Sequence, residues 1–366
     1  MYPALAVLQA LSEAGSQGQT DLTTLQVLWV GGEKGMEEEL VKRAGIPFMA
    51  IPAAGVHGVG LKALPANLAR LGRGVARSRR ILSNFRPQVM LFTGGYVAVP
   101  VAFSAWLPLR MIPRPRSLVY VPDIEPGWAL KALVRMADHV ALTVEESRMY
   151  IPSRIPSTVT GYPIRPELAN WDKPGARQTL GLQPDLPVFL VMGGSRGARS
   201  INQALFSGLP QLLKDMQIVH VTGQVAWPEV EHIRQSLPVD LVSRYQAYPY
   251  LHQEMGAALA SADLVLSRAG ASSLGEYPMF GLPAILAPYP YAWRYQSVNA
   301  QYLVERGAAV LIKDADLAKQ LLPIVQDILF DSTRRHAMAS AMRSMAHPQA
   351  AQSIAGKLRS LAANSS

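Results

Sequence analysis

One pattern recurs along most of this chain: an apolar run, a turn of glycine or other small residues, then apolar residues at helical spacing. The runs are LQVLWVGG, QVMLFTGG, PVFLVMGG, IVHVTG, DLVLSRAG and PAILAP. Strands that alternate with helices pair as a parallel sheet, because each parallel neighbour needs a crossover connection. The sequence therefore predicts an α/β fold, with ligand sites at the carboxyl ends of the strands.

The length and layout predict two such sheets. A chain of 366 residues exceeds what one hydrophobic core holds. One set of strand–helix units precedes about residue 160 and another follows it, with the Pro- and Gly-rich stretch TVTGYPIRPELANWDKPG between them. We expect two Rossmann-like domains, residues 1–160 and 161–346, whose parallel sheets face each other across a cleft. A C-terminal helix, about 347–366, is the candidate to pack back on the first domain.

Composition excludes several classes of function. The chain has no cysteine, which rules out disulfides, thiolate metal sites and cysteine nucleophiles. No histidine cluster with ligand spacing is present, and we predict no metal and no cofactor. The longest apolar stretch, YVAVPVAFSAWLPL, is interrupted by two prolines and is shorter than the roughly 20 residues of a membrane span. No secretory signal is visible.

Basic residues are concentrated in one block. Between Glu39 and Asp123 there are twelve Lys or Arg and no acid, although the whole chain is only +9. Such a block predicts a polyanionic partner. Few aromatics interleave with it and no nucleic-acid module is recognisable, so nucleic acid is not the expected partner.

The segment LKALPANLARLGRGVARSRRIL mixes leucines with arginines, which is typical of surfaces that lie on anionic membranes. An ordinary amphipathic helix whose leucines face the core is the alternative. The predicted membrane-contacting residues are Arg70, Arg73, Arg77, Arg79 and Arg80.

The stretch PVFLVMGGSRGARSINQAL predicts an anion site. Gly193, Gly194, Ser195 and Gly197 follow a buried strand and precede a helix. Glycines let the backbone approach a ligand closely, and a helix N-terminus offers N–H groups and a positive dipole end, which suit a diphosphate. The spacing is neither GxGxxG nor a Walker loop. A strand–helix turn that needs glycine for its conformation alone is the alternative.

A second small-residue turn, in ADLVLSRAGASSLGEYPMFGLPAILAP, predicts another anion site. Ala271, Ser272 and Ser273 would lie at a helix N-terminus, with Glu276 in the first turn. That carboxylate either caps the helix or binds the two hydroxyls of a ribose. Two anion-binding turns and a sugar-binding carboxylate in one half of the chain favour a nucleotide diphosphate as ligand.

Two carboxamides follow an aromatic cluster in PYPYAWRYQSVNAQYL. Gln296 and Asn299 are three residues apart and so share one face of a helix. A carboxamide both donates and accepts hydrogen bonds, which suits sugar hydroxyls. A solvated polar face is the alternative.

Six stretches, in register and in order, resemble motifs of the MurG family: YPALA, FTGGYVAVP, GYPIRPEL, GGSRGARSIN, SRAGASSLGE and YQSVNA. That family transfers N-acetylglucosamine from UDP-N-acetylglucosamine to a lipid-linked muramoyl-pentapeptide, completing lipid II of peptidoglycan. The resemblance implies twin Rossmann domains of the GT-B type and an inverting reaction without a metal. It also implies a peripheral protein on the cytoplasmic face of the cell membrane.

The resemblance also implies roles for particular residues. Gly194, Ser195 and the turn Ala271 to Ser273 would hold the diphosphate, and Arg165 would add a cation. Leu251 would present its backbone to the uracil, while Glu276 would bind the ribose and Gln296 the donor sugar. Asp123 and Asn299 complete the expected substrate-binding set.

The chain departs from the family pattern near the sugar. Aspartate at Asp123 replaces an asparagine that approaches the donor sugar in the family, which adds a charge there. The other replacements are Tyr120 for a histidine, Val121 for a glutamate, Tyr162 for an asparagine and Tyr295 for a histidine. These changes concern acceptor or donor recognition and leave the nucleotide motifs intact.

The chain opens where the family's glycine loop and its histidine have just ended. Pro3 with Leu5, Leu8 and Leu11 predicts that the first helix begins at once. We expect a misplaced gene start, with a strand and the glycine loop encoded upstream; a real truncation is the alternative. Because the family's loop histidine is not in this sequence, the catalytic base is unassigned. His57 is a candidate, although a lone histidine in a Gly-rich loop is more often structural or solvated.

Two further functions fit the same motifs. A UDP-sugar transferase acting on another lipid, such as diacylglycerol, would share the nucleotide-binding half and differ in the first domain. An inactive homologue that only binds UDP-sugar or a membrane partner is the non-enzymatic alternative.

Overall fold

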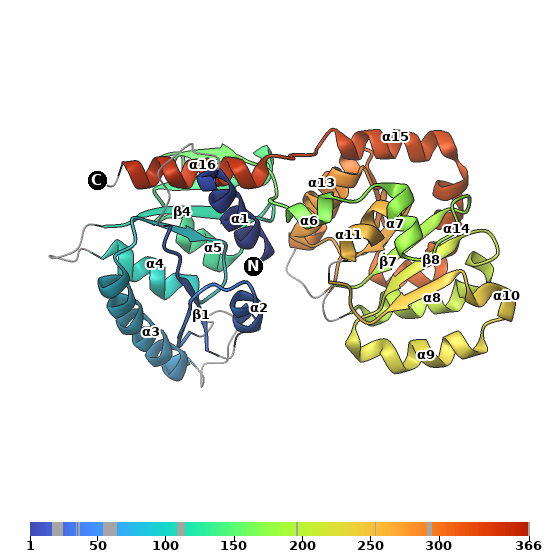
Figure 1. Ribbon diagram of the computed structural model, residues 1–366, viewed down its shortest axis with the longest axis horizontal. Coiled ribbons are helices and arrows are strands. Elements are labelled where there is room, and N and C mark those ends of the chain that lie inside the picture. The colour runs from blue at the N-terminus through green and yellow to red at the C-terminus, as the bar shows by residue number, and fades with distance from the viewer. Residues whose placement is uncertain are drawn as a thin grey trace. The chain divides into compact units, whose positions relative to one another are not determined.

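The computed structural model describes residues 1–16, 25–33, 35, 37–53, 64–107, 114–194, 197–252, 254–290 and 295–364 (Figure 1). The chain divides into two compact units. Unit 1 comprises Met1–Pro163 with Gln349–Ser366, and unit 2 comprises Ile164–Pro348. The boundary after Pro163 lies inside the Pro- and Gly-rich stretch, parts of which form regular structure on either side of it. No helix within the described ranges combines the length and apolarity that crossing a bilayer requires.

Unit 1 alternates strands with helices and ends with the last helix of the chain. Its elements are α1 (Tyr2–Ser16), β1 (Trp29–Gly32), α2 (Glu37–Arg43), β2 (Phe48–Ile51), α3 (Leu64–Phe85), β3 (Val89–Phe92), α4 (Ala98–Trp106), β4 (Arg116–Val121), α5 (Trp128–Val134), β5 (His139–Leu142), the 3-10 helix η1 (Glu145–Tyr150), β6 (Ser157–Val159) and α16 (Ala350–Ala363). The helix predicted at the start of the chain is confirmed as α1.

The strands of unit 1 form two parallel sheets. One has the order β3-β4-β5-β6, and the other pairs β1 with β2. The parallel arrangement predicted from the sequence is confirmed, but not as one sheet, because no strand in the described ranges joins β1 to β3. Apolar residues of both sheets, including Ile51 and Val119, share one core with α3, α4 and α5. Helix α16 packs on α1 and on β3 and β4 of this unit.

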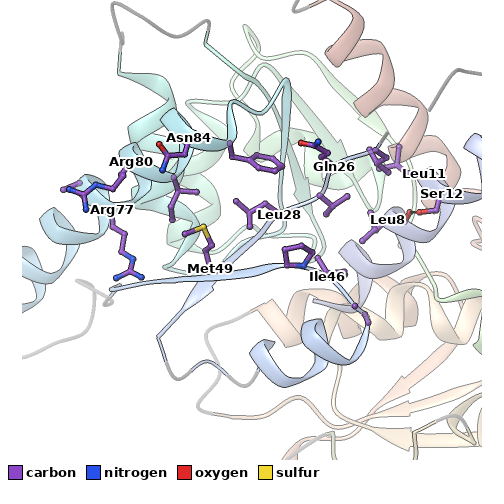
Figure 2. A pocket seen from close by; sticks show the side chains of 18 residues that line it. Leu8, Leu11, Ser12, Gln26, Leu28, Ile46, Met49, Arg77, Arg80 and Asn84 are labelled. Carbon is purple, nitrogen blue, oxygen red and sulfur yellow. Dashed lines mark hydrogen bonds between the residues drawn. The ribbon is translucent and has the colours of Figure 1, made fainter. Parts of the chain in front are cut away.

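A cavity of about 1460 Å³ lies between α1, α3 and the segment that leads into β1. Figure 2 shows Leu8 and Leu11 of α1 at one end, Leu28 in the middle, and Arg77 and Arg80 of α3 at the other end. The wall is mostly apolar. Leu8 and Leu11 therefore face this cavity and stay half-buried, while Ala6 and Val7 carry the tight packing of α1.

Unit 2 has one six-stranded parallel sheet in the order β12-β11-β10-β7-β8-β9. Its elements are α6 (Pro166–Ala169), α7 (Lys173–Thr179), β7 (Val188–Met192), α8 (Arg199–Leu212), β8 (Gln217–Val221), η2 (Gln224–Ala226), α9 (Trp227–Ser236), α10 (Val239–Val242), β9 (Tyr245–Tyr248), α11 (Met255–Ser261), β10 (Leu264–Ser267), η3 (Ala271–Leu274), α12 (Glu276–Phe280), β11 (Ala284–Leu286), α13 (Tyr295–Glu305), β12 (Ala309–Leu311), η4 (Asp314–Asp316), α14 (Leu317–Phe330) and α15 (Ser332–Arg343).

The four central strands of unit 2, β11, β10, β7 and β8, are almost completely buried, as expected for a parallel sheet covered on both faces, while the edge strands β9 and β12 are partly buried. Phe189 of β7, Ile218 of β8 and Leu266 of β10 belong to one core with α8 and α14. Because all six strands run in the same direction, the turns after β7, β8, β10 and β11 lie at one edge of this sheet. The predicted ligand-binding motifs of this half follow those strands.

Candidate functional site

The turn between β7 and α8 requires its glycines. Gly194 and Gly197 have φ angles of +80° and +76°. A Cβ atom on Gly193 would lie 2.2 Å from the backbone nitrogen of Ala198, and one on Gly197 would lie 2.5 Å from the carbonyl oxygen of Thr222. Any larger residue would push this turn away from its neighbours. Ser195, the predicted diphosphate ligand, lies outside the described residues.

A buried hydrogen-bonded chain holds the start of α8 against β8 and β9. Asn202 Nδ2 donates to the carbonyl oxygen of Thr222 at 3.0 Å, which leaves Asn202 Oδ1 to accept from His220 Nε2 at 3.1 Å. His220 Nδ1 then accepts from the Tyr245 hydroxyl at 2.7 Å. Burial lowers the pKa of His220 to about 3. The imidazole is therefore neutral, and this chain of bonds fixes its tautomer.

The turn after β10 is a 3-10 helix followed by the short α12, which begins at Glu276. Ser273 is buried, its hydroxyl donates to the carbonyl oxygen of Gly270 at 2.6 Å, and its backbone nitrogen donates to the same oxygen at 3.0 Å. Both donors of Ser273 close the turn, and its predicted contact with an anion stays a prediction. Ala271 and Ser272 are half-buried and remain candidates for that contact.

Glu276 lies beside Ser272 and Arg165. As a whole residue Glu276 is half-buried, and burial of its carboxyl raises the pKa to about 7, against the opposing effects of the Arg165 charge and a hydrogen bond with Ser272. The structure thus brings together three residues that the sequence placed in the substrate site. A carboxyl with a pKa raised by desolvation next to a cation is typical of a functional site.

The two carboxamides of α13 play different roles. Gln296 is half-buried, and its Oε1 accepts from the backbone nitrogen of Tyr289 at 2.8 Å. Asn299 is fully buried, and its Nδ2 donates to the carbonyl oxygen of Ala269 at 3.2 Å. The Asn299 side chain therefore supports the turn after β10 from inside the core, and its contact with substrate stays a prediction.

Two other predicted residues lie near strand ends. Leu251 is buried just after β9, so its backbone rather than its side chain is the part left for a ligand. In unit 1, Asp123 is half-buried directly after β4. His57 lies outside the described residues.

Two departures from the family pattern contact each other in unit 1. Tyr120 is buried in β4, and its ring meets the Tyr162 ring edge-on at 6.4 Å between centroids. The Tyr120 hydroxyl forms a 2.7 Å hydrogen bond with Thr143 Oγ1. Burial raises the pKa of the Tyr120 hydroxyl well above its ordinary value. The two tyrosines therefore pack against each other inside unit 1.

The five predicted membrane arginines are all exposed on α3. Ser78, Ile81 and Leu82 on the same helix are buried, and α3 packs on α4. The leucines are divided: Leu68 is 52 % exposed, while Leu71 is half-buried. The alternative of an ordinary amphipathic helix whose leucines face the core thus explains one face of α3, but it does not explain the exposed Leu68.

Sequence reasoning missed Arg268, Ser200 and Asp314. Arg268 follows β10 directly, and its guanidinium forms an ion pair with Asp314 and a 2.8 Å hydrogen bond with Ser200 Oγ. The available signal was an arginine at the carboxyl end of a buried strand. Within the described ranges, no three His, Asp or Glu side chains lie close enough together to hold a metal ion.

Comparison with known proteins identifies the family. Residues 1–115 match the glycosyltransferase family 28 N-terminal domain, and residues 188–354 match its C-terminal domain. A protein of Roseiflexus sp. named UDP-N-acetylglucosamine–N-acetylmuramyl-(pentapeptide) pyrophosphoryl-undecaprenol N-acetylglucosamine transferase is 41 % identical, over 99 % of this chain and 92 % of its own. The chain belongs to the MurG family. The Desulforudis audaxviator protein of the same name is 38 % identical over 99 % of this chain and 95 % of its own.

Solved structures agree with the MurG assignment. The crystal structure of Acinetobacter baumannii MurG matches with a TM-score of 0.74 and 27 % identity, over 98 % of this chain and 95 % of that one. The UDP-GlcNAc 2-epimerase of Neisseria meningitidis matches at 0.64 with 13 % identity, over 98 % and 97 % of the two chains, a likeness of fold alone. The predicted two-domain GT-B fold is confirmed.

Proposed function

We propose that this chain transfers N-acetylglucosamine from UDP-N-acetylglucosamine to a lipid-linked muramoyl-pentapeptide, the step that forms lipid II. The family assignment and the named relatives support this reaction. One observation supports binding of the UDP-sugar donor by unit 2. Arg165, Ser272 and Glu276 lie together beside the sheet edge where the turn before α8 also lies.

The donor's charge distribution matches this edge. In the proposed binding mode, the diphosphate lies at the turn before α8. This helix has fourteen residues, and its N-terminus presents N–H groups and a positive dipole end. Arg165 adds a full positive charge. The Glu276 carboxylate accepts hydrogen bonds from the ribose hydroxyls, and Gln296 faces the sugar.

The chemistry demands two things of the protein. An acceptor hydroxyl attacks C1 of the sugar while the bond to UDP breaks, so negative charge grows on the leaving diphosphate. The α8 dipole and Arg165 stabilise that charge electrostatically. The attacking hydroxyl must also lose its proton to a base.

A coupled assay tests the proposed reaction. The protein is incubated with UDP-N-acetylglucosamine and a short-chain analogue of the lipid-linked muramoyl-pentapeptide, and UDP release is followed. We expect release that requires both substrates. Release that requires diacylglycerol instead would move the proposal to another lipid acceptor, and donor binding without release on any lipid would support an inactive homologue.

We also propose that α3 attaches the protein peripherally to anionic membrane at its cytoplasmic face. Five exposed arginines and the exposed Leu68 lie on this helix, which contains no acidic residue. On α4, which packs against α3, Phe103 and Trp106 are also exposed and stack on each other at 6.3 Å. Cations that meet headgroups beside apolar side chains are what interfacial binding requires.

Vesicle sedimentation tests this attachment. We expect binding to phosphatidylglycerol vesicles at low salt, weakening as salt screens the charges, and loss of binding in R73E/R77E. The control variant K214E/K319E makes the same charge change at exposed lysines of unit 2. Equal loss in both variants would show dependence on net charge alone and contradict a specific role for α3.

A further inference from the structure

Two partly buried ion pairs mark the two ends of β10. Asp263 precedes the strand and pairs with Arg177 at 2.9 Å, and Arg268 follows the strand and pairs with Asp314. The two pairs are similarly enclosed: both arginine side chains are 12 % exposed, and the aspartates are 15 % and 21 % exposed. The two ion pairs differ in position, because only the Arg268–Asp314 pair lies at the sheet edge that carries the candidate site.

The Arg268 guanidinium joins three segments that are far apart in sequence. Its Nη1 donates to the carbonyl oxygen of Ala287, just after β11, at 2.8 Å, and also to Asp314, in η4. Its Nη2 donates to Ser200 Oγ at 2.8 Å. Ser200 Oγ in turn donates to Asp314 Oδ1 at 2.7 Å, so arginine, serine and aspartate form a closed triangle.

Two of the segments that Arg268 joins lead to parts of the candidate site. Ser200 is the second residue of α8 and follows the glycine turn. Ala287 precedes Tyr289, whose ring lies 5.4 Å from the guanidinium carbon of Arg268 and whose backbone nitrogen donates to Gln296. The triangle therefore connects the start of the diphosphate-binding helix with the segment that holds Gln296.

We propose that Arg268 is a positioning residue that locks the α8 turn and the Gln296 segment into one geometry, so that the diphosphate and the sugar of the donor are bound together. This inference rests on the donor site proposed above. A guanidinium suits the task, because its planar fork bonds several acceptors in fixed directions, which a lysine ammonium does not reproduce. Arg268 acts on the ligand through its neighbours.

Three variants test the proposal. R268Q breaks the triangle, S200A removes one corner with little change in volume, and R177Q breaks the matched pair at the other end of β10. Thermal unfolding of each variant establishes that it is folded, and calorimetry measures its affinity for UDP-N-acetylglucosamine and for UDP. We expect affinity for UDP-N-acetylglucosamine to fall about tenfold in R268Q and about threefold in S200A, and to change less than about twofold in R177Q. R268K should fail to restore it.

The same variants separate this inference from the donor proposal. Hydrogen exchange in the ligand-free protein should increase in R268Q and S200A both at residues 198–205 and at residues 284–290, and R177Q should leave these segments protected. Unchanged exchange in both segments, or equal loss of affinity in R177Q, would overturn the positioning role. Failure of the wild-type protein to bind any UDP compound would contradict the donor proposal alone, since the exchange result does not depend on a ligand.

Discussion

At the scale of single residues, the Glu276 carboxyl has the most informative environment. Burial raises its pKa to about 7, whereas hydrogen bonds from ribose hydroxyls favour the ionised form. Donor binding should therefore release a proton below pH 7. We expect the affinity for UDP-N-acetylglucosamine to rise about tenfold between pH 6 and pH 8, as the carboxyl ionises before the ligand arrives.

Calorimetry at the two pH values measures this effect. UDP-N-acetylglucosamine is the right ligand, because its doubly esterified diphosphate does not titrate in this range. The variant E276Q should bind weakly at both pH values and show no such rise. The same rise in E276Q would mean that another group titrates.

His220 predicts how acid destabilises unit 2. The imidazole is neutral in the folded protein because burial lowers its pKa to about 3, whereas the unfolded chain protonates near its ordinary value of 6.5. The unfolded state then binds one more proton, so stability is lost as pH falls below about 6.5. We expect an added slope of about 1.4 kcal/mol per pH unit between those values.

Urea unfolding between pH 4 and pH 6.5 checks the His220 prediction. H220Q should unfold with a shallower pH dependence than the wild type. An equal slope in H220Q and the wild type would contradict the assignment.

At the scale of elements, the glycine turn before α8 is constrained in two ways at once. Gly197 has a φ of +76°, and a Cβ there would meet the Thr222 carbonyl oxygen at 2.5 Å. Gly181 has a φ of +64° with no heavy atom within 4 Å of the position a Cβ would take. An alanine there therefore measures the cost of the positive φ alone, without a steric clash. We expect G181A to cost about 1 kcal/mol of unfolding free energy, and G197A to cost about 2 kcal/mol or more and to weaken UDP binding.

Denaturant unfolding and UDP titration of the two glycine variants provide the test. If G197A bound UDP like G181A, the turn would not be the diphosphate site. Such a result would leave the fold unaffected.

The sequence predicted elements better than it predicted side-chain environments. All six quoted runs contain strands, because buried parallel strands read as continuous apolar runs. The burial of Asn299 and Ser273 could not be predicted, because it depends on packing between segments, which local spacing does not record. Arg268 was missed for the same reason: its partners Ser200 and Asp314 are 68 and 46 residues away.

At the scale of the whole molecule, the first and last helices of the chain stabilise the same unit. Ile354 and Leu358 of α16 are buried, and α16 packs on α1. We expect I354A to lower the unfolding free energy of unit 1 by about 2–5 kcal/mol, while UDP binding by unit 2 stays as in the wild type. L209A, in the core of unit 2, should instead destabilise that unit.

Scanning calorimetry with and without UDP distinguishes the two units. UDP should raise the unfolding temperature of unit 2 in I354A as it does in the wild type. Loss of UDP binding in I354A would contradict the claim that the core around Ile354 in unit 1 is independent of the UDP site in unit 2.

The most direct measurement is calorimetric titration of the protein with UDP-N-acetylglucosamine, with GDP-mannose as the control nucleotide sugar. We expect one site per chain for the uridine compound, at least about tenfold weaker binding in R165A, and no comparable binding of the guanosine compound. Equal binding of both compounds, or wild-type affinity in R165A, would contradict the claim that this edge of unit 2 is a UDP-sugar site.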